Sequence, residues 1–99
     1  MKKAMGAKEA YLSNDPDVVV DAVKVAMAEL KLEVTSATAS KVDGEVRGLT
    51  AQGKDISVKV KSDGPNVSKM TVHVGTMGDK SISEAIIDAT RKHLSQRKS

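Results

Sequence analysis

The chain has 99 residues, a net charge of +3 at pH 7 and 39% hydrophobic residues, a composition typical of one small globular domain. Tyr11 is its only aromatic residue and it contains no cysteine, which requires an aliphatic core and excludes disulfides and thiolate metal ligands. It also lacks a run of about 18 apolar residues, the minimum for a membrane-spanning helix.

We expect one folded domain, residues 7–94, with a short segment at each end. Residues 1–6 are expected to be disordered or to be a cloning or linker remnant. Residues 95–99 are expected to form a frayed basic tail. The positive charge of the chain is concentrated near this end, in Arg91, Lys92, Arg97 and Lys98.

A short edge strand is expected at Lys8 to Ser13, followed by a helix. Asn14-Asp-Pro-Asp17 supplies an acceptor side chain for the helix cap, a proline at the first helical position and acids near the positive end of the helix dipole. The helix is predicted to run to about Lys31. Its apolar arc is wider than one sheet face needs, so we expect its flank to pack on the second helix or on another subunit. The residues predicted to face inward are Val19, Val20, Val23, Ala26, Met27 and Leu30, with Val18, Ala22 and Val25 on the flank.

Two strands with weaker patterns are predicted after this helix. Leu32 to Ser40 is rich in Thr, Ser and Ala, which indicates a strand of modest burial. Asp43-Gly44 is a strong hairpin signal that leads into the next strand, Glu45 to Ala51.

The turn at Gln52-Gly53 allows two registers for the following strand. In a three-residue loop with Gly53 left-handed, Val46, Gly48 and Thr50 share the inner face of the sheet with the apolar residues of that strand. A two-residue turn reverses the faces. We prefer the three-residue loop because it leaves Arg47 in water.

The two clearest strands are Asp55 to Lys61 and Lys69 to Gly75, in which apolar and polar residues alternate with period two. The turn residues Asp-Gly-Pro-Asn at positions 63–66 join them. Because the two strands are adjacent in sequence and joined by a short turn, they are expected to pair in an antiparallel manner.

A second helix is predicted from Ser81 to about Leu94, because Ser81 followed three residues later by Glu84 forms a capping-box pattern. Its predicted inward residues are Ile82, Ala85, Ile86 and Ala89. The element order predicts an α+β fold, a two-layer sandwich with two helices on one face of a four-stranded antiparallel meander. The short N-terminal strand would lie at the edge of that sheet.

The outer face of the sheet carries the candidate binding residues. An anion or a phosphate backbone could contact this face together with the basic end of the second helix. Sheet-based RNA readers depend on stacked aromatic residues, which these strands lack, so we favour solvated strands over a nucleic-acid site. The candidate residues are Lys59, Lys61, Lys69, His73, Arg91 and Lys92.

No pattern predicts catalysis, a cofactor or a metal site. Gly75-Thr-Met-Gly-Asp-Lys-Ser81 follows a strand and opens a helix, but it has neither the spacing nor the lysine position of a P-loop. We interpret it as a turn. His73 and His93 have no neighbouring carboxylate or thiolate at metal-binding spacing, so we treat them as a surface residue and a helix-end charge.

Several segments resemble a family of small bacterial lipoproteins that is a domain of unknown function. The similarity is carried by Ala26-Met-Ala-Glu-Leu30, by the spacing from Gly44 to Val58, and by Thr71-Val-His-Val-Gly75 with Gly78-Asp79. Members of that family are usually exported and anchored to lipid through an N-terminal cysteine, which this chain lacks. The resemblance therefore implies a fold and a cell-envelope or periplasmic location, but no active site; if the chain is complete as given, a cytoplasmic location is expected.

Together these observations predict a non-enzymatic small binding or structural module whose partner is unknown. Its partner would be a protein, or a second copy bound through the apolar arc of the first helix. The alternative is a weak binder of nucleic acid or an anionic surface through the basic outer face and tail.

Overall fold

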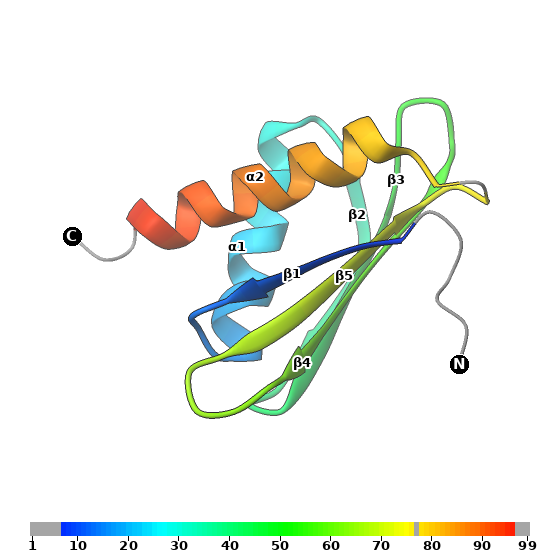
Figure 1. Ribbon diagram of the computed structural model, residues 1–99. Coiled ribbons are helices and arrows are strands. Elements are labelled where there is room, and N and C mark those ends of the chain that lie inside the picture. Colours follow the sequence, from blue (N-terminus) through cyan, green and yellow to red (C-terminus); the bar gives the residue numbers. More distant parts are fainter. Residues whose placement is uncertain (1–6, 77, 97–99) are drawn as a thin grey trace.

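Two helices lie on one face of a five-stranded antiparallel sheet, giving the two-layer α+β architecture that the sequence predicts (Figure 1). The computed structural model describes residues 7–76 and 78–96, so the ends 1–6 and 97–99 lie outside the described residues. The elements in chain order are β1 (Lys8–Leu12), α1 (Pro16–Glu29), β2 (Glu33–Ala39), β3 (Asp43–Leu49), β4 (Asp55–Ser62), β5 (Ser68–Val74) and α2 (Lys80–Gln96).

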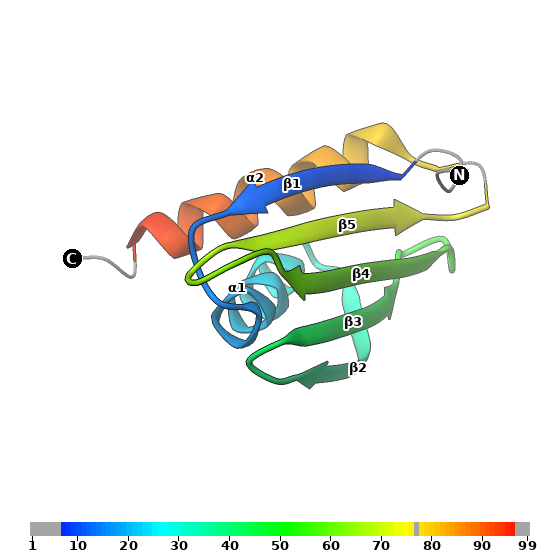
Figure 2. The ribbon, with the colours of Figure 1, turned by 60° about the horizontal axis from the view of Figure 1, so that its bottom comes forward.

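The sheet has the strand order β1-β5-β4-β3-β2 (Figure 2). Strands β2 to β5 form the predicted meander. The short N-terminal edge strand that the sequence indicates is β1, which pairs with β5 and makes a fifth strand at the edge of the sheet. The two free edges of the sheet are therefore β1 and β2.

The core lies between the inner face of the sheet and the helices. Val58, Val60, Val72 and Val74 are fully buried, as is Ile86 of α2. All the buried residues of this cluster are aliphatic or methionine. Burying each such side chain contributes roughly 1.5–3 kcal/mol, so these alternating residues are what hold the two layers together.

Helix α1 begins at Pro16, as predicted, but its cap differs from the prediction. Asp15 occupies the cap position without a side-chain bond to the helix. Its Oδ1 instead accepts a hydrogen bond from the backbone N–H of Asn66, at 3.2 Å, in the turn between β4 and β5. The carboxylate thus ties two distant segments together. The helix ends at Glu29, two residues earlier than expected, because Lys31 adopts a left-handed conformation with φ of 61°.

The flank of α1 packs only partly on α2. Ala22 is buried and Val18 packs against the core, whereas Val25 remains 47% exposed. Leu30, which we expected to face inward, is exposed because it lies beyond the last helical turn. The second helix therefore covers part of the wide apolar arc and leaves Val25 and Leu30 exposed to water.

The hairpin between β2 and β3 lies elsewhere than predicted. Its turn is Ser40 to Asp43, closed by a bond from the N–H of Ser40 to the carbonyl oxygen of Asp43 at 2.7 Å, and Gly44 already belongs to β3. The Ser40 hydroxyl accepts the N–H groups of Val42 and Asp43. This serine therefore performs the role that we assigned to Asp43-Gly44. Every residue of β2 is exposed, so its burial is lower than expected.

The loop between β3 and β4 has the register that we preferred. Gly53 has φ of 84°, and the N–H of Thr50 bonds the carbonyl oxygen of Lys54 at 2.9 Å, which closes a three-residue loop. Val46 and Gly48 pair with Val58 and Ile56 and are buried with them. The hydrophobic pattern and the glycine together determine which face is inside.

Helix α2 starts one residue before the predicted cap, and its inner face is rotated. Asp79 caps it, since Asp79 Oδ1 accepts the N–H of Ile82 at 3.1 Å, while Ser81 is exposed in the first turn. The helix continues through Gln96, so Ser95 and Gln96 are helical. Its buried residues are Ser83, Ile86, Ile87, Thr90 and Leu94, whereas the expected Ile82, Ala85 and Ala89 are only half-buried.

Candidate functional site

Both helices cover the inner face of the sheet, and no described element covers the other side (Figure 1). We call that other side the outer face. It carries every second residue of each strand, because side chains alternate along a strand. Its members are Glu9 and Tyr11 of β1, Lys69, Thr71 and His73 of β5, Asp55, Ser57, Lys59 and Lys61 of β4, Asp43, Glu45, Arg47 and Leu49 of β3, and Glu33, Ser36 and Thr38 of β2.

Strand register places charges of opposite sign in one row across the middle of the outer face. The row runs from Glu9 through Thr71 and Lys59 to Glu45. Glu45 Oε2 also lies 3.0 Å from Nη1 of Arg47 on the same strand. Side chains on adjacent strands and one face interact directly, so Lys59 has an acid, Glu45, as its partner on one side and Thr71 on the other, with Glu9 one strand further.

A second row places two lysines side by side. Lys61 and Lys69 are direct cross-strand partners, with Tyr11 on one side and Asp43 on the other. Nζ of Lys69 lies 3.2 Å from Oε2 of Glu9. The hydrogen bond and charge of that carboxylate raise the pKa of Lys69 above its ordinary value of 10.5. The glutamate offsets part of the like-charge repulsion between the lysines.

One end of the outer face is hollowed into a polar depression of about 450 Å³, where β5 leaves the sheet. Among its lining residues only His73 was predicted as a site residue. Arg47 and Lys54 were missed, although the preferred register already placed Arg47 on this face. Lys54 lies in a loop, and its Nζ is 3.6 Å from Oδ2 of Asp79. The lining residues are Arg47, Gly53, Lys54, Asp55, Ser57, His73, Gly75 and Thr76.

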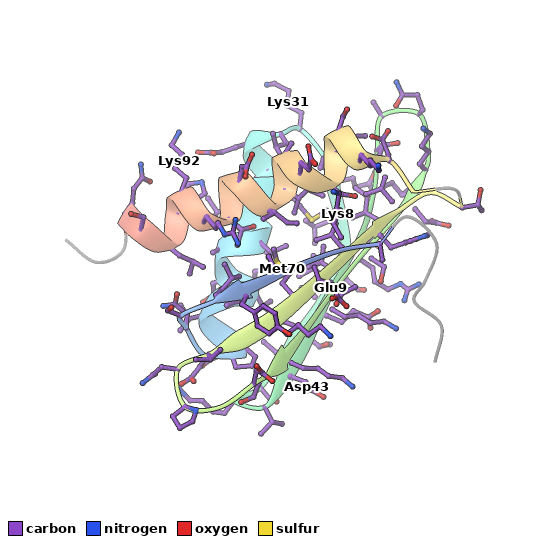
Figure 3. The ribbon with its side chains drawn as sticks, in the orientation of Figure 1. Lys8, Glu9, Lys31, Asp43, Met70 and Lys92 are labelled. Atoms are coloured by element: carbon purple, nitrogen blue, oxygen red, sulfur yellow. The ribbon has the colours of Figure 1, made fainter. Side chains whose placement is uncertain are left out.

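The structure separates the predicted site residues into two groups. The three lysines and the histidine of β4 and β5 lie together on the outer face, whereas the two basic residues of α2 lie in the helical layer. Lys92 extends from the side of α2 that faces away from the sheet (Figure 3). Arg91 borders a separate depression beside β1, which Tyr11 also lines. The candidate residues therefore do not form one continuous basic surface.

The turn before α2 offers little to an anion. Asp79 occupies the start of the helix, where its carboxylate accepts the Ile82 N–H and pairs with Lys54. A carboxylate at a helix N-terminus occupies the position that a bound phosphate would take. Gly75 and Gly78 have φ of 69° and 79°, which agrees with our interpretation of the segment as a turn.

His93 connects the C-terminal ends of the two helices. Its Nε2 lies 3.0 Å from Oε1 of Glu29, the last residue of α1, and its side chain is only 17% exposed. The two atoms are close but not aligned for a hydrogen bond. The contact is therefore an ion pair when the imidazole is protonated, and His93 lies in the last turn of α2, as expected for a helix-end charge.

Within 7–76 and 78–96, no three histidine, aspartate or glutamate side chains are grouped so that they could hold a metal ion. In the same part of the chain, neither helix is long and apolar enough to cross a bilayer.

These features define a small α+β domain with one helix-covered sheet face and one open face of mixed charge. The chain belongs to the family described as "Protein of unknown function (DUF3568)", whose model matches residues 4–93. No curated protein matches the chain at a significant level. The family match confirms the resemblance to a domain of unknown function. Its description does not mention lipoproteins, so the lipid anchor stays a proposal.

Proposed function

We propose that the chain is a non-enzymatic binding module of the bacterial cell envelope that recognises another protein through the outer face. The observation that supports this most is the charge pattern of that face. Its acidic residues are distributed among the basic ones and outnumber them. The acids are Glu9, Glu33, Asp43, Glu45 and Asp55, and the bases are Arg47, Lys59, Lys61 and Lys69.

A surface of interspersed charges is complementary to another protein surface rather than to a polyanion. Positive and negative groups placed in a fixed pattern give specificity for a partner with the inverse pattern. A phosphate backbone would meet repulsion from the acids of the same rows. Tyr11, which is 57% exposed on this face, adds a side-chain type that is enriched at protein interfaces.

The envelope location is supported by the resemblance to small bacterial lipoproteins described above. Its test is the sequence upstream of Met1 in the gene. An apolar segment that ends in a lipidated cysteine would place the protein at the envelope. An upstream stop codon directly before a start at Met1 would contradict that location.

Site-specific photo-crosslinking in the producing cells tests whether the outer face binds a protein. A photoreactive amino acid at Ser57 replaces a half-exposed residue of β4 that lines the depression of this face, and the same amino acid at Asp88 of α2 is the control. We expect one discrete protein adduct from position 57 and none from position 88. Adducts from position 88 alone, or nucleic acid as the crosslinked species, would contradict the proposal.

The second candidate function is weak binding of nucleic acid or an anionic surface. The pairing of Lys61 with Lys69, next to Lys59, is the observation in its favour. A phosphate-backbone binder loses affinity steeply as salt increases. Retention of the folded chain on heparin at low salt, abolished at moderate salt and by Lys61→Glu, would support this candidate. Elution with the void volume at low salt would exclude it.

A further inference from the structure

The charged residues of the β1 edge of the sheet already form ion pairs within the chain. The strand has only five residues, and Nζ of Lys8 lies 3.3 Å from Oε2 of Glu84 on α2. Glu9, the next residue, pairs with Lys69. Short strands with charged side chains resist pairing with another chain, so this edge is protected.

The β2 edge lacks such protection over most of its length. All seven of its residues are exposed, and no charged residue or proline follows Glu33 within the strand. A register shift between Val34 and Ser36 interrupts the first half. The stretch from Ser36 to Ala39 is regular, uncharged and exposed, which makes it the part of the sheet that is open to an added strand.

The hydrogen-bond pattern shows which residues could accept that strand. The N–H of Ser40 bonds Asp43 of β3, and ladder bonds alternate along an antiparallel strand. Ser36 and Thr38 therefore direct their backbone groups to β3. Ala37 and Ala39 direct their N–H and C=O groups to the free edge.

We propose that two copies of the chain pair through β2 in an antiparallel arrangement centred on Thr38, so that their sheets become one continuous sheet. Ala37 of one copy then lies opposite Ala39 of the other, and each alanine donates and accepts one backbone hydrogen bond. Thr38 lies opposite itself at the two-fold axis, in a pair without hydrogen bonds. The pairing uses the backbone groups of the β2 edge, although the side chains of Ser36 and Thr38 also belong to the outer face. Neither proposal depends on the other.

Helix α1 has a charged side chain directed toward this edge. Oδ2 of Asp17 lies 3.3 Å from Nζ of Lys41 in the β2–β3 loop. Val20, one turn later, lies directly over Gly44, since a Cβ at position 44 would be 2.5 Å from Val20 Cγ2. The N-terminal half of α1 is therefore next to the regular part of β2.

The charges of α1 favour a second copy as the occupant of the edge. Gly44 pairs with Ala39, so the proposed axis passes close to the level of Val20 on the helix. Asp17 lies one turn before that level and Lys24 one turn after it, where Nζ of Lys24 lies 3.9 Å from Oδ1 of Asp21 on the same helix. A two-fold rotation brings Asp17 of each copy toward Lys24 of the other. Both the alanine ladder and the charges are thus self-complementary, as an isologous interface requires.

Single cysteines test the register, because the chain contains none. Facing Cα atoms in a pair without hydrogen bonds lie about 4.5 Å apart, which a disulfide can bridge. We expect Thr38→Cys to form a covalent dimer under mild oxidation. Ser36→Cys, on the same strand and face, is the control, because its two copies would lie roughly 14 Å apart. Equal crosslinking of both variants, or none with Thr38→Cys, would overturn the proposed register.

Sedimentation equilibrium tests the dimer without crosslinking. We expect the unmodified chain to sediment as twice its 10.5 kDa mass. Thr38→Lys and Thr38→Glu, each checked for folding by circular dichroism, are expected to be monomers alone and to form a mixed dimer when combined. A monomeric native chain at every concentration would overturn the proposal and leave the β2 edge to a strand of another protein.

Discussion

Val20 of α1 lies directly above Gly44 of β3, at a distance that leaves no room for a side chain on the strand. A Cβ at position 44 would lie 2.5 Å from Val20 Cγ2 and 2.8 Å from the carbonyl oxygen of Thr38. Gly44 is therefore required for the close approach of helix and sheet rather than for a turn.

Replacing Gly44 by alanine is expected to lower the free energy of unfolding by about 1–3 kcal/mol, because the added methyl group overpacks this contact. The loss should be smaller when Val20 is also replaced by alanine, since the shortened side chain makes room. Urea denaturation of the two single variants and the double variant measures the coupling. An equal cost in both backgrounds would contradict the assigned contact.

Gly48 provides the matched comparison. A Cβ there would overlap the backbone carbonyl oxygen of Glu33 and lie 2.7 Å from Met27 Cε. Because a Cβ at position 48 would come closer to a backbone atom than a Cβ at position 44 would, and a backbone atom cannot move aside as a side chain can, Gly48→Ala should cost more stability than Gly44→Ala. Met27→Ala should not relieve it. Relief by Met27→Ala would show that the contact with Met27 Cε, rather than the contact with the Glu33 carbonyl oxygen, causes the loss.

The strands were largely predictable from sequence, whereas glycine at position 44 shows where local reasoning failed. Alternation identified β4 and β5, and Gly53 identified the register of β3, because these signals are local. Asp43-Gly44 has the composition of a hairpin turn, yet the turn lies before it and the glycine is required by a helix distant in sequence. A turn preference and a close packing contact select the same residue type, so sequence alone does not separate them.

The cap of α2 is Asp79 in the structure, whereas the sequence predicted Ser81. Asp79→Ala should destabilise the protein by about 1 kcal/mol, because it removes the acceptor of the Ile82 N–H and the partner of Lys54. Ser81→Ala should be nearly neutral, since Ser81 is exposed in the first turn. Thermal unfolding of both variants decides between the two caps. A larger loss of stability from Ser81→Ala than from Asp79→Ala would support Ser81 as the cap, as the sequence predicted.

Removing the buried hydroxyl group of Ser68 should lower the stability of the protein, whereas removing that of Thr90 should not. Ser68 Oγ donates a 2.6 Å hydrogen bond to the carbonyl oxygen of Asn14, whereas Thr90 Oγ1 has no such partner among the described residues. Ser68→Ala should therefore cost about 1–3 kcal/mol, since it leaves a carbonyl unsatisfied. Thr90→Val keeps the shape and should be neutral or stabilising. A loss on Thr90→Val as large as that on Ser68→Ala would indicate a partner for the threonine.

The raised pKa of Lys69 predicts a pH dependence. A lysine whose pKa is higher in the folded state stabilises that state fully below its ordinary value of 10.5 and loses this contribution as the pH rises above it. Glu9→Gln should therefore destabilise the protein at neutral pH and have a decreasing effect above pH 10.5. In a Lys69→Met background the same substitution should show no such change. An effect of Glu9→Gln that persists unchanged at high pH would contradict the pairing.

The candidate site was only partly predictable from sequence, because local patterns determine the faces of strands but not how a helix packs on the sheet. Residues of β4 and β5 could be assigned to one face because alternation determines it. Arg91 and Lys92 are in a helix whose inner face is rotated from the expected position, so their place relative to the sheet depends on packing. Arg47 and Lys54 come together with His73 only because the end of β3, the start of β4 and the end of β5 meet at the same depression.

If the outer face, rather than the helical layer, binds a protein partner, reversing charges on that face should abolish binding. Two matched double variants test it with a photoreactive amino acid at Thr71 as the reporter. Lys59→Glu with Lys61→Glu reverses two charges on the outer face, and Arg91→Glu with Lys92→Glu makes the same change on α2. We predict that the first pair abolishes the crosslinked adduct and that the second leaves it unchanged. Loss of the adduct only with the α2 pair would show that the partner binds the helical layer instead of the outer face.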